Sequence, residues 1–118
     1  MTKVYSLLLV IFIILSVIAV HHFPVASSKQ WCIANSTETD AELLLNIYLG
    51  CEHKFVNCKP IYPGGSCFDP DTLISHASFV MNAFFQLHNR TKEYCGYNNT
   101  GIITSTDPSY GSCVYYVS

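Results

Sequence analysis

Charged side chains are scarce in this sequence. Lys and Arg together number 6 and Asp and Glu number 8, so that 12% of the 118 residues are charged and the net charge is −2. The few basic residues form no patch that would neutralise successive phosphates, so we do not expect a nucleic acid as a partner. A chain of this length has room for one small domain and not for a large multi-domain enzyme.

Motifs that carry catalysis or bind metals are also missing. The sequence has no GxSxG nucleophile elbow, and no CxxC or HxxxH spacing that would place ligands around a metal ion. A glycosidase needs two carboxylates on either side of one bond, yet Asp69 is placed to cap a helix and Asp107 to close a turn. We therefore expect no enzyme activity, no cofactor and no bound metal.

One long hydrophobic run is present, and it lies near the first residue. Val4–Val20 carries no charge, and a stretch of small residues follows it. This order is typical of a secretory signal peptide over residues 1–28, with cleavage after Ser27 or Ser28. The alternative is a membrane anchor, although the run is at the lower limit of about 17 residues for a spanning helix. We expect residues 29–118 to form a secreted domain without stable insertion in a membrane.

Cysteine is abundant, with all six residues after the hydrophobic run. A secreted domain of this size buries too little core to be stable without help, and disulfides are the usual remedy. Metal binding is the alternative, but the spacing does not favour it. Spacing alone does not choose among the many possible pairings. The cysteines are Cys32, Cys51, Cys58, Cys67, Cys95 and Cys113.

Three Asn-x-Ser/Thr sequons fit the same secretory route. They begin at Asn35, Asn89 and Asn98, and each is a candidate for N-glycosylation. A three-residue pattern also arises by chance, so each sequon alone is a weak indication.

Two segments show helical periodicity. Thr39 and the glutamate three residues later form a capping box, which predicts a helix over residues 40–49 that Gly50 ends. Asp69 as N-cap, followed by proline, predicts a second helix over residues 70–88 with a broad apolar face. On the predicted polar side of this helix lie Ser75, Asn82, Gln86 and Asn89.

The remaining part of the chain has strand character. Residues 101–106 are rich in β-branched side chains, and a turn separates them from a second candidate strand at residues 112–116. This arrangement predicts an antiparallel β-hairpin. The expected fold is a small disulfide-rich α+β domain, in which two packed helices carry the hairpin.

Aromatic residues are the most informative excess. The sequence has 8 Tyr, 7 Phe and 1 Trp, and many of the tyrosines fall in predicted loops. Sugar rings present apolar C–H faces that pack on aromatic rings, with roughly 0.5–1.5 kcal/mol per contact beyond the buried area. The alternative is that loop tyrosines only cover a thin core. We predict ligand contacts at Tyr62, Tyr97 and Tyr110, with Asp107 and Gln86 as partners for sugar hydroxyls.

Four segments resemble the plant X8 domain, which is also called carbohydrate-binding module family 43. They are Trp31–Ala34, Pro63–Pro70, His76–Phe79 and Thr106–Cys113. The likeness extends from Trp31 to about Tyr115. The family occurs attached to plant β-1,3-glucanases, in callose-binding proteins at plasmodesmata, and as short secreted proteins that include pollen allergens.

This resemblance implies two packed helices with a small sheet and binding of β-1,3-glucan, such as callose or laminarin, without hydrolysis. It also implies the disulfides Cys32–Cys95, Cys51–Cys58 and Cys67–Cys113. We expect a monomer in the cell wall or apoplast, with a glucanase or a wall protein as a further partner.

Two alternative functions stay open at this point. One is a disulfide-rich secreted protein that binds a wall or receptor protein in reproductive tissue. The other is a glucan hydrolase, whose activity would be lost on Asp69→Asn.

Overall fold

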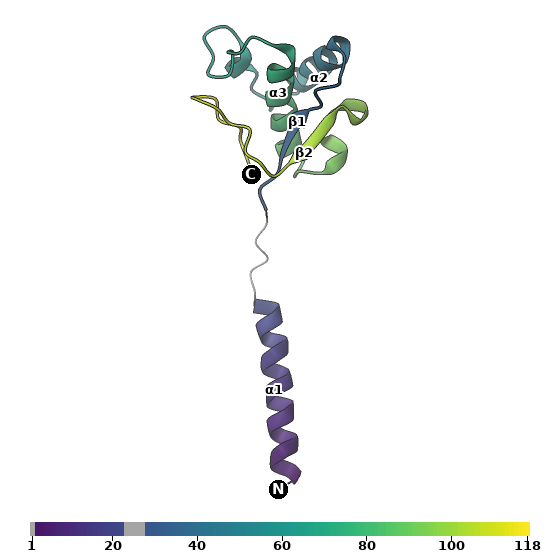
Figure 1. The fold of residues 1–118 in the computed structure, drawn as a ribbon, viewed down its shortest axis with the longest axis vertical. Coiled ribbons are helices and arrows are strands. Elements are labelled where there is room, and N and C mark those ends of the chain that lie inside the picture. The colour runs from purple at the N-terminus through teal and green to yellow at the C-terminus, as the bar shows by residue number, and fades with distance from the viewer. Residues whose placement is uncertain (1, 23–27) are drawn as a thin grey trace.

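The computed structural model describes residues 2–22 and 28–118. Helix α1 (Thr2–His22) covers the hydrophobic run, and the disulfide-linked domain begins at strand β1 (Trp31–Ala34) (Figure 1). Of the residues described, no helix combines the length and apolarity that crossing a membrane requires. The predicted cleavage position after Ser27 lies outside the described residues, and the signal peptide remains a prediction.

Helix α2 (Asp40–Glu52) begins where the sequence predicts. The side-chain oxygen of Thr39 accepts the backbone N–H of Glu42, whose carboxylate accepts the N–H of Thr39 in return. The predicted end at residue 49 is wrong, because Gly50 does not stop the helix. Gly50 lies directly against the next helix, α3 (Leu73–Leu87): a Cβ on it would lie 2.2 Å from Cγ1 of Val80.

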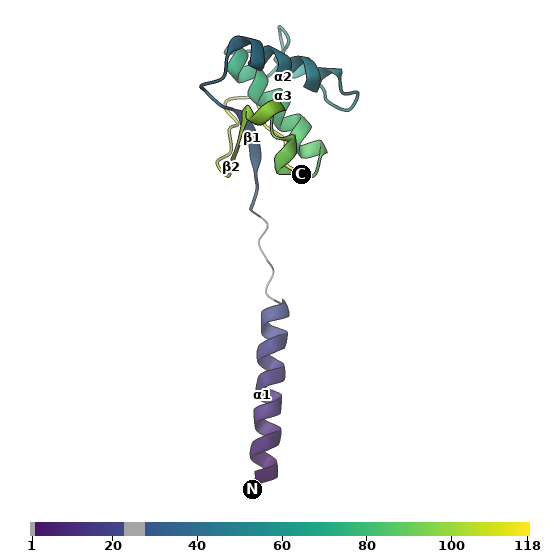
Figure 2. The same cartoon turned by 90° about the vertical axis from the view of Figure 1, so that its right-hand side faces the viewer.

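Helix α3 (Leu73–Leu87) is shorter than the predicted range of residues 70–88. Its N-cap is Thr72 rather than Asp69, since the Thr72 hydroxyl accepts the N–H of Ser75. The N–H of Thr72 is itself bonded to the carbonyl of Pro70 in a tight turn, so Pro70 precedes the helix. Figure 2 shows α2 lying across α3.

The two-stranded antiparallel sheet is present, but the predicted partner strand is wrong. Strand β2 (Gly101–Thr104) pairs with β1, with Trp31 opposite Thr104 and Ala34 opposite Gly101. Residues 112–116 form no strand, and Tyr110 and Cys113 make only an isolated bridge. The N–H groups of Cys32 and Ala34 donate to side chains of α3. Strand β1 therefore lies between α3 and β2 and is the inner strand.

A buried polar row along α3 consists of the side chains of Ser78, Asn82 and Gln86. These side chains hydrogen-bond to neighbouring backbone, as the main chain of a third β-strand would. Ser78 and Asn82 accept the β1 N–H groups at 3.0 and 3.1 Å. Asn82 also donates to the carbonyl of Tyr116 at 2.8 Å, and Gln86 accepts the N–H of Ser118 at 3.1 Å. The C-terminal segment is therefore fixed to α3 through its backbone. The predicted polar side of this helix is partly interior: Asn82 is 1% and Gln86 3% exposed.

Apolar packing and disulfides complete the domain. Val80 and Phe85 of α3 are fully buried and belong to two separate core clusters. The three disulfides join the same cysteines that the resemblance implies: Cys32–Cys95, Cys51–Cys58 and Cys67–Cys113. Cys32–Cys95 joins β1 to the segment before β2, and Cys67–Cys113 joins the loop before α3 to the segment after β2. The small disulfide-rich α+β class is confirmed.

The buried polar row generates a prediction about stability. Asn82→Ala leaves the buried N–H of Cys32 and the partly buried carbonyl of Tyr116 without their partner, so we expect the free energy of unfolding to fall by about 2–3 kcal/mol. Leu87→Ala, in the same helix at 44% exposure, is the matched control. Denaturant unfolding measures both, and equal small losses for the two variants would contradict the role given to Asn82.

Candidate functional site

A cavity of about 260 Å³ opens between α2, α3 and the segment that carries two 3-10 turns, η2 (Lys92–Tyr94) and η3 (Tyr97–Asn99). Its wall is mainly apolar, and Glu93 is the one charged residue among those that line it. Tyr94 and Tyr97 are 43% and 57% exposed, so their rings are accessible from solvent. The lining consists of Asn46, Leu49, Gly50, Met81, Phe84, Glu93, Tyr94, Gly96 and Tyr97.

The cavity continues into a cluster of aromatic rings, because Phe84 and Tyr94 belong to both. The ring of His88 stacks on Tyr94 with centroids 4.2 Å apart and planes 13° apart, and it lies 4.3 Å from Phe84. His53 packs edge-on against Phe84 at 5.7 Å, and Phe55 beyond it is 68% exposed. Together the cavity and these rings form a continuous aromatic face.

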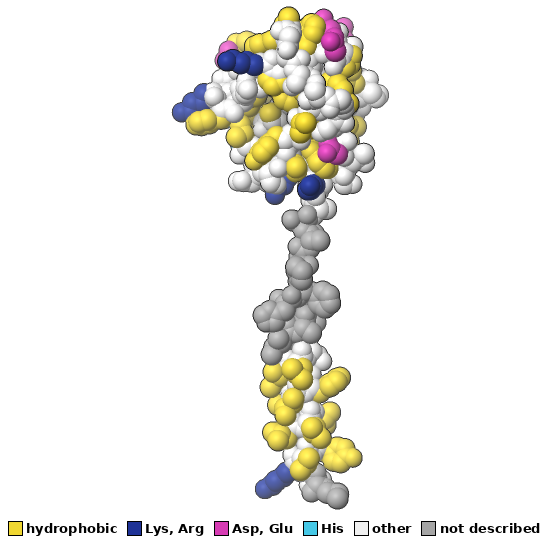
Figure 3. All heavy atoms as spheres, turned by 90° about the vertical axis from the view of Figure 1, so that its left-hand side faces the viewer, with side chains coloured by type: hydrophobic (Ala, Val, Ile, Leu, Met, Phe, Trp, Pro, Cys, Tyr) yellow, Lys and Arg dark blue, Asp and Glu magenta, His cyan; other side chains and the backbone are white. Residues whose placement is uncertain are grey.

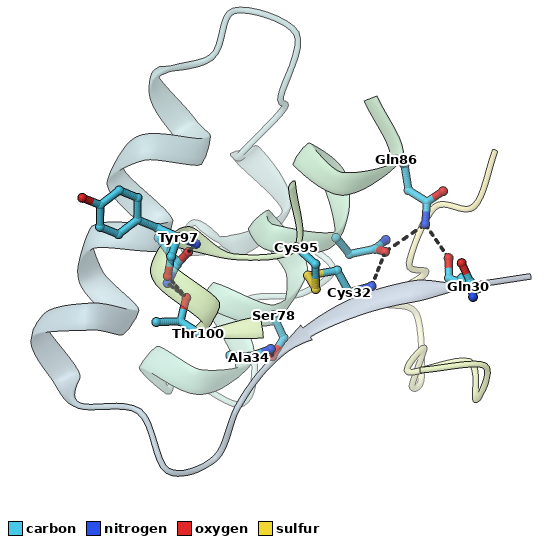
Figure 4. The surroundings of a disulfide bond; sticks show 10 residues. Gln30, Cys32, Ala34, Ser78, Gln86, Cys95, Tyr97 and Thr100 are labelled. Atoms are coloured by element: carbon cyan, nitrogen blue, oxygen red, sulfur yellow. Dashed lines mark hydrogen bonds between the residues drawn. A yellow bond between two sulfur atoms is a disulfide. The ribbon is translucent and has the colours of Figure 1, made fainter. Parts of the chain in front are cut away.

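Tyr97 is held by a network of hydrogen bonds rather than by packing of its ring. Asn46, which is buried, accepts the N–H of Tyr97 at 2.9 Å and donates to the hydroxyl of Thr100 at 2.8 Å. That hydroxyl donates in turn to the carbonyl of Tyr97 at 2.6 Å. Figure 4 shows the Tyr97 side chain directed away from the neighbouring Cys32–Cys95 disulfide. The backbone is fixed while the ring remains free to meet a ligand.

Gly96 allows this turn to close. Its φ is +83°, which side chains rarely adopt, and a Cβ there would lie 2.6 Å from the N of Gly101 and 2.8 Å from Cε of Met81. No residue with a side chain fits this position without displacing the turn that carries Tyr97.

Tyr62 lies in a second, more open hollow on the other border of α2. Apart from Tyr62, the hollow is lined by α2 residues that do not face the cavity. The side chain of Tyr62 is 52% exposed. A hydrogen bond with the carboxylate of Glu52 raises the pKa of the Tyr48 hydroxyl, so that this phenol stays a donor. Helix α2 therefore separates Tyr62 from Tyr97.

Tyr110 and Asp107 are placed elsewhere, in the segment that follows β2, and Tyr110 reaches the start of α3. The Tyr110 hydroxyl is 3.1 Å from the hydroxyl of Ser75. Asp107 is exposed, and hydrogen bonds from the side chain and backbone of Ser109 lower the pKa of its carboxyl. Neither residue lines the cavity, so the predicted site residues do not gather at one point.

Gln86 is a poor candidate for a ligand contact. Its amide nitrogen donates to the carbonyl of Gln30 at 2.7 Å and to Asn82 at 3.0 Å. Since the side chain is buried and bonded inside the domain, we leave it out of the proposed binding surface.

Five members of the aromatic face were not predicted from the sequence: His53, Phe55, Phe84, His88 and Tyr94. Phe84 and His88 are four residues apart on one helix, which is a signal that they share a side. Nothing local indicates that His53 and Tyr94 meet them, because those contacts depend on how the loops after α2 and α3 fold back.

Charge is sparse at the cavity, where Glu93 is the one charged residue of the lining. On the other side of the domain, which Figure 3 shows, charged side chains also lie in small separate groups among hydrophobic and uncharged polar ones. Several carboxylates already have structural partners: Glu42 caps α2 and Glu52 bonds Tyr48. An uncharged ligand with apolar faces is the class that such a surface suits.

The match to known proteins agrees with this architecture. The X8 domain family matches residues 30–102. The major pollen allergen Ole e 10 of Olea europaea is 41% identical over 92 residues, which cover 78% of this chain and 75% of the allergen. A glucan endo-1,3-beta-glucosidase of Triticum aestivum is 48% identical over 86 residues, or 73% of this chain and 18% of that protein.

A third relative, plasmodesmata callose-binding protein 2 of Arabidopsis thaliana, is 34% identical over 89 residues, which are 75% of this chain and 45% of that protein. The chain thus spans most of the allergen but less than a fifth of the wheat glucosidase. On this evidence the chain belongs to the X8 domain family.

The turn at Gly96 generates a second prediction. Gly96→Ala combines a strained φ with clashes, so we expect it to lower the melting temperature clearly more than Gly64→Ala. Gly64 has the matching φ of +86° but nothing within 4 Å of a built Cβ, and its substitution should cost only about 1 kcal/mol. Thermal unfolding and the amide NMR signals of residues 96–101 measure the difference. Equal losses would show that space around Gly96 is not limiting.

Proposed function

We propose that this chain is a non-catalytic module that binds β-1,3-glucan of the callose or laminarin type. The observation that carries the proposal is the aromatic face: exposed rings around a mainly apolar cavity of about 260 Å³, with little charge. Glucose rings offer C–H faces for Tyr94 and Tyr97, and their hydroxyls find the carboxylate of Glu93.

The relatives support the same ligand class. One named relative is a callose-binding protein, and the wheat glucosidase that shares this region matches over only 18% of its length. Most of the wheat glucosidase therefore lies outside the region that this chain matches, and its name describes the activity of that longer protein. A binding module shared by both explains the likeness without any hydrolysis by this chain.

The remaining predicted residues extend the proposal beyond the cavity. Tyr62, in the hollow across α2, would contact a long glucan that continues over this helix. Tyr110, near the start of α3, and Asp107 are further candidate contacts. The affinity for a short oligosaccharide should depend on the aromatic face alone, whereas the affinity for a polymer should also depend on Tyr62.

Binding of laminarihexaose tests the aromatic face. Tyr97→Ala and Tyr94→Ala each remove a ring from the cavity, and we expect affinity to fall roughly 3- to 20-fold. Tyr116→Ala is the matched control, because this tyrosine is 63% exposed on the C-terminal segment. Calorimetry gives the affinities, and NMR titration shows which amides shift.

The result that would overturn the proposal is a folded wild-type chain whose spectrum does not respond to laminarihexaose. If the same chain retains one wall or receptor protein in a pulldown, the alternative of a protein-binding module replaces it. Release of reducing sugar by the purified chain would instead favour a hydrolase.

We also propose that the domain acts outside the cell, in the wall or apoplast, as a monomer and with a glucanase or wall protein as a further partner. Three disulfides suit an oxidising compartment. Sequencing of the secreted chain should begin at Ser28 or Lys29. An intact N-terminus that keeps the chain in the membrane fraction would refute removal of residues 1–28.

A further inference from the structure

Two of the three sequons share one backbone arrangement, and both border the aromatic face. In each, four residues form a turn whose two central residues have left-handed φ values: 58° and 56° at Asn89 and Arg90, and 56° and 63° at Asn98 and Asn99. The N–H of the fourth residue donates to the carbonyl of the first in both turns. Left-handed φ at both central positions is the signature of a type I′ turn.

The same side-chain bond closes both turns. The sequon threonine hydroxyl donates to the carbonyl of the first residue, from Thr100 to Tyr97 at 2.6 Å and from Thr91 to His88 at 2.8 Å. An aromatic residue thus immediately precedes each acceptor asparagine. The third sequon differs, because the side-chain oxygen of Asn35 accepts bonds from Thr37.

The two turns differ in how free the aromatic ring is. The ring of His88 is half-buried and already stacks on Tyr94 at 4.2 Å. Tyr97 is 57% exposed, with its backbone fixed by Asn46. A sugar attached to the exposed Asn98 therefore has an accessible ring on a fixed backbone beside it, while a sugar on Asn89 does not.

We propose that Asn98 carries an N-linked glycan whose first sugar packs on the ring of Tyr97 and thereby competes with glucan for this ring. In the transfer step, Nδ2 of Asn98 loses a proton and bonds to the anomeric carbon of a lipid-linked oligosaccharide, with the lipid diphosphate as leaving group. The sequon threonine is 2% exposed after folding, so the transfer takes place on the unfolded chain. The competition, unlike the sugar–ring contact, rests on the proposed glucan binding.

The experiment uses the full chain secreted from a eukaryotic host that makes high-mannose glycans. Mass spectrometry of glycopeptides determines whether Asn98 is occupied, and an unmodified Asn98 would overturn the proposal. Endoglycosidase H then trims each glycan to its first sugar, whereas peptide-N-glycosidase removes the whole glycan and converts the asparagine to aspartate, for which Asn98→Asp in the unglycosylated chain is the control.

The contact of sugar and ring is measured without any glucan. In the trimmed form we expect ring-current shifts in the N-acetylglucosamine protons, and a melting temperature roughly 2–6 °C above that of the fully deglycosylated form. Tyr97→Ala should abolish both effects, while removal of the Asn89 sequon by Asn89→Gln should preserve them. If the shifts and the melting temperature are unchanged by Tyr97→Ala, the sugar does not pack on this ring.

Competition is measured separately with laminarihexaose. We expect the single-sugar form to bind roughly 3- to 10-fold more weakly than the deglycosylated form, and Asn98→Gln to recover the loss while Asn89→Gln does not. Equal affinity of all forms would reject competition at Tyr97. Absence of binding by the deglycosylated chain would instead reject the proposed function and leave the sugar–ring contact standing.

Discussion

The hydrogen bonds that α3 makes with backbone on either side of it are the constraint on which the rest of the domain depends. A two-stranded sheet has little stability by itself, and the inner edge of β1 would be buried without partners. Ser78 and Asn82 supply those partners, and Gln86, four residues further along the same side of the helix, donates to the carbonyl of Gln30 just before the strand. Because Asn82 and Gln86 also hold the C-terminal segment, helix, sheet and terminus form one unit.

That unit gives the aromatic face its rigidity. The segment with Tyr94 and Tyr97 is joined to β1 by the Cys32–Cys95 disulfide and to α2 by the bonds of Asn46. Surfaces that are ordered before a ligand arrives lose less conformational entropy on binding. Weak individual contacts between rings and sugars then suffice for recognition of a polymer, and no deep pocket is needed.

Local signals in the sequence were enough for the helices and the class of fold, and not for the strand pairing. The capping box at Thr39 acts over three residues, and it marks the start of α2 correctly. The pairing of β1 with β2 joins residues about seventy positions apart, and a hairpin at residues 101–116 was the simpler local solution. The burial of Asn82 and Gln86 was not predicted for a related reason. Polar residues on a helix are expected to face solvent unless the backbone groups to which they hydrogen-bond are already known. Of the site, Tyr97 was predicted from its loop position, but the rings that join it come from segments that only the fold unites.

The attachment of the C-terminal segment has a consequence for how this part of the chain tolerates change. Its carbonyl at Tyr116 and the N–H and hydroxyl of Ser118 are the groups that α3 binds, while the side chains of Val114 and Tyr116 project into solvent. Hydrogen bonds to the main chain do not depend on which side chains are present at Val114 and Tyr116. Related sequences are therefore free to diverge at these two positions while conserving the number of residues, since an insertion or deletion would shift every docking group out of step with the helix.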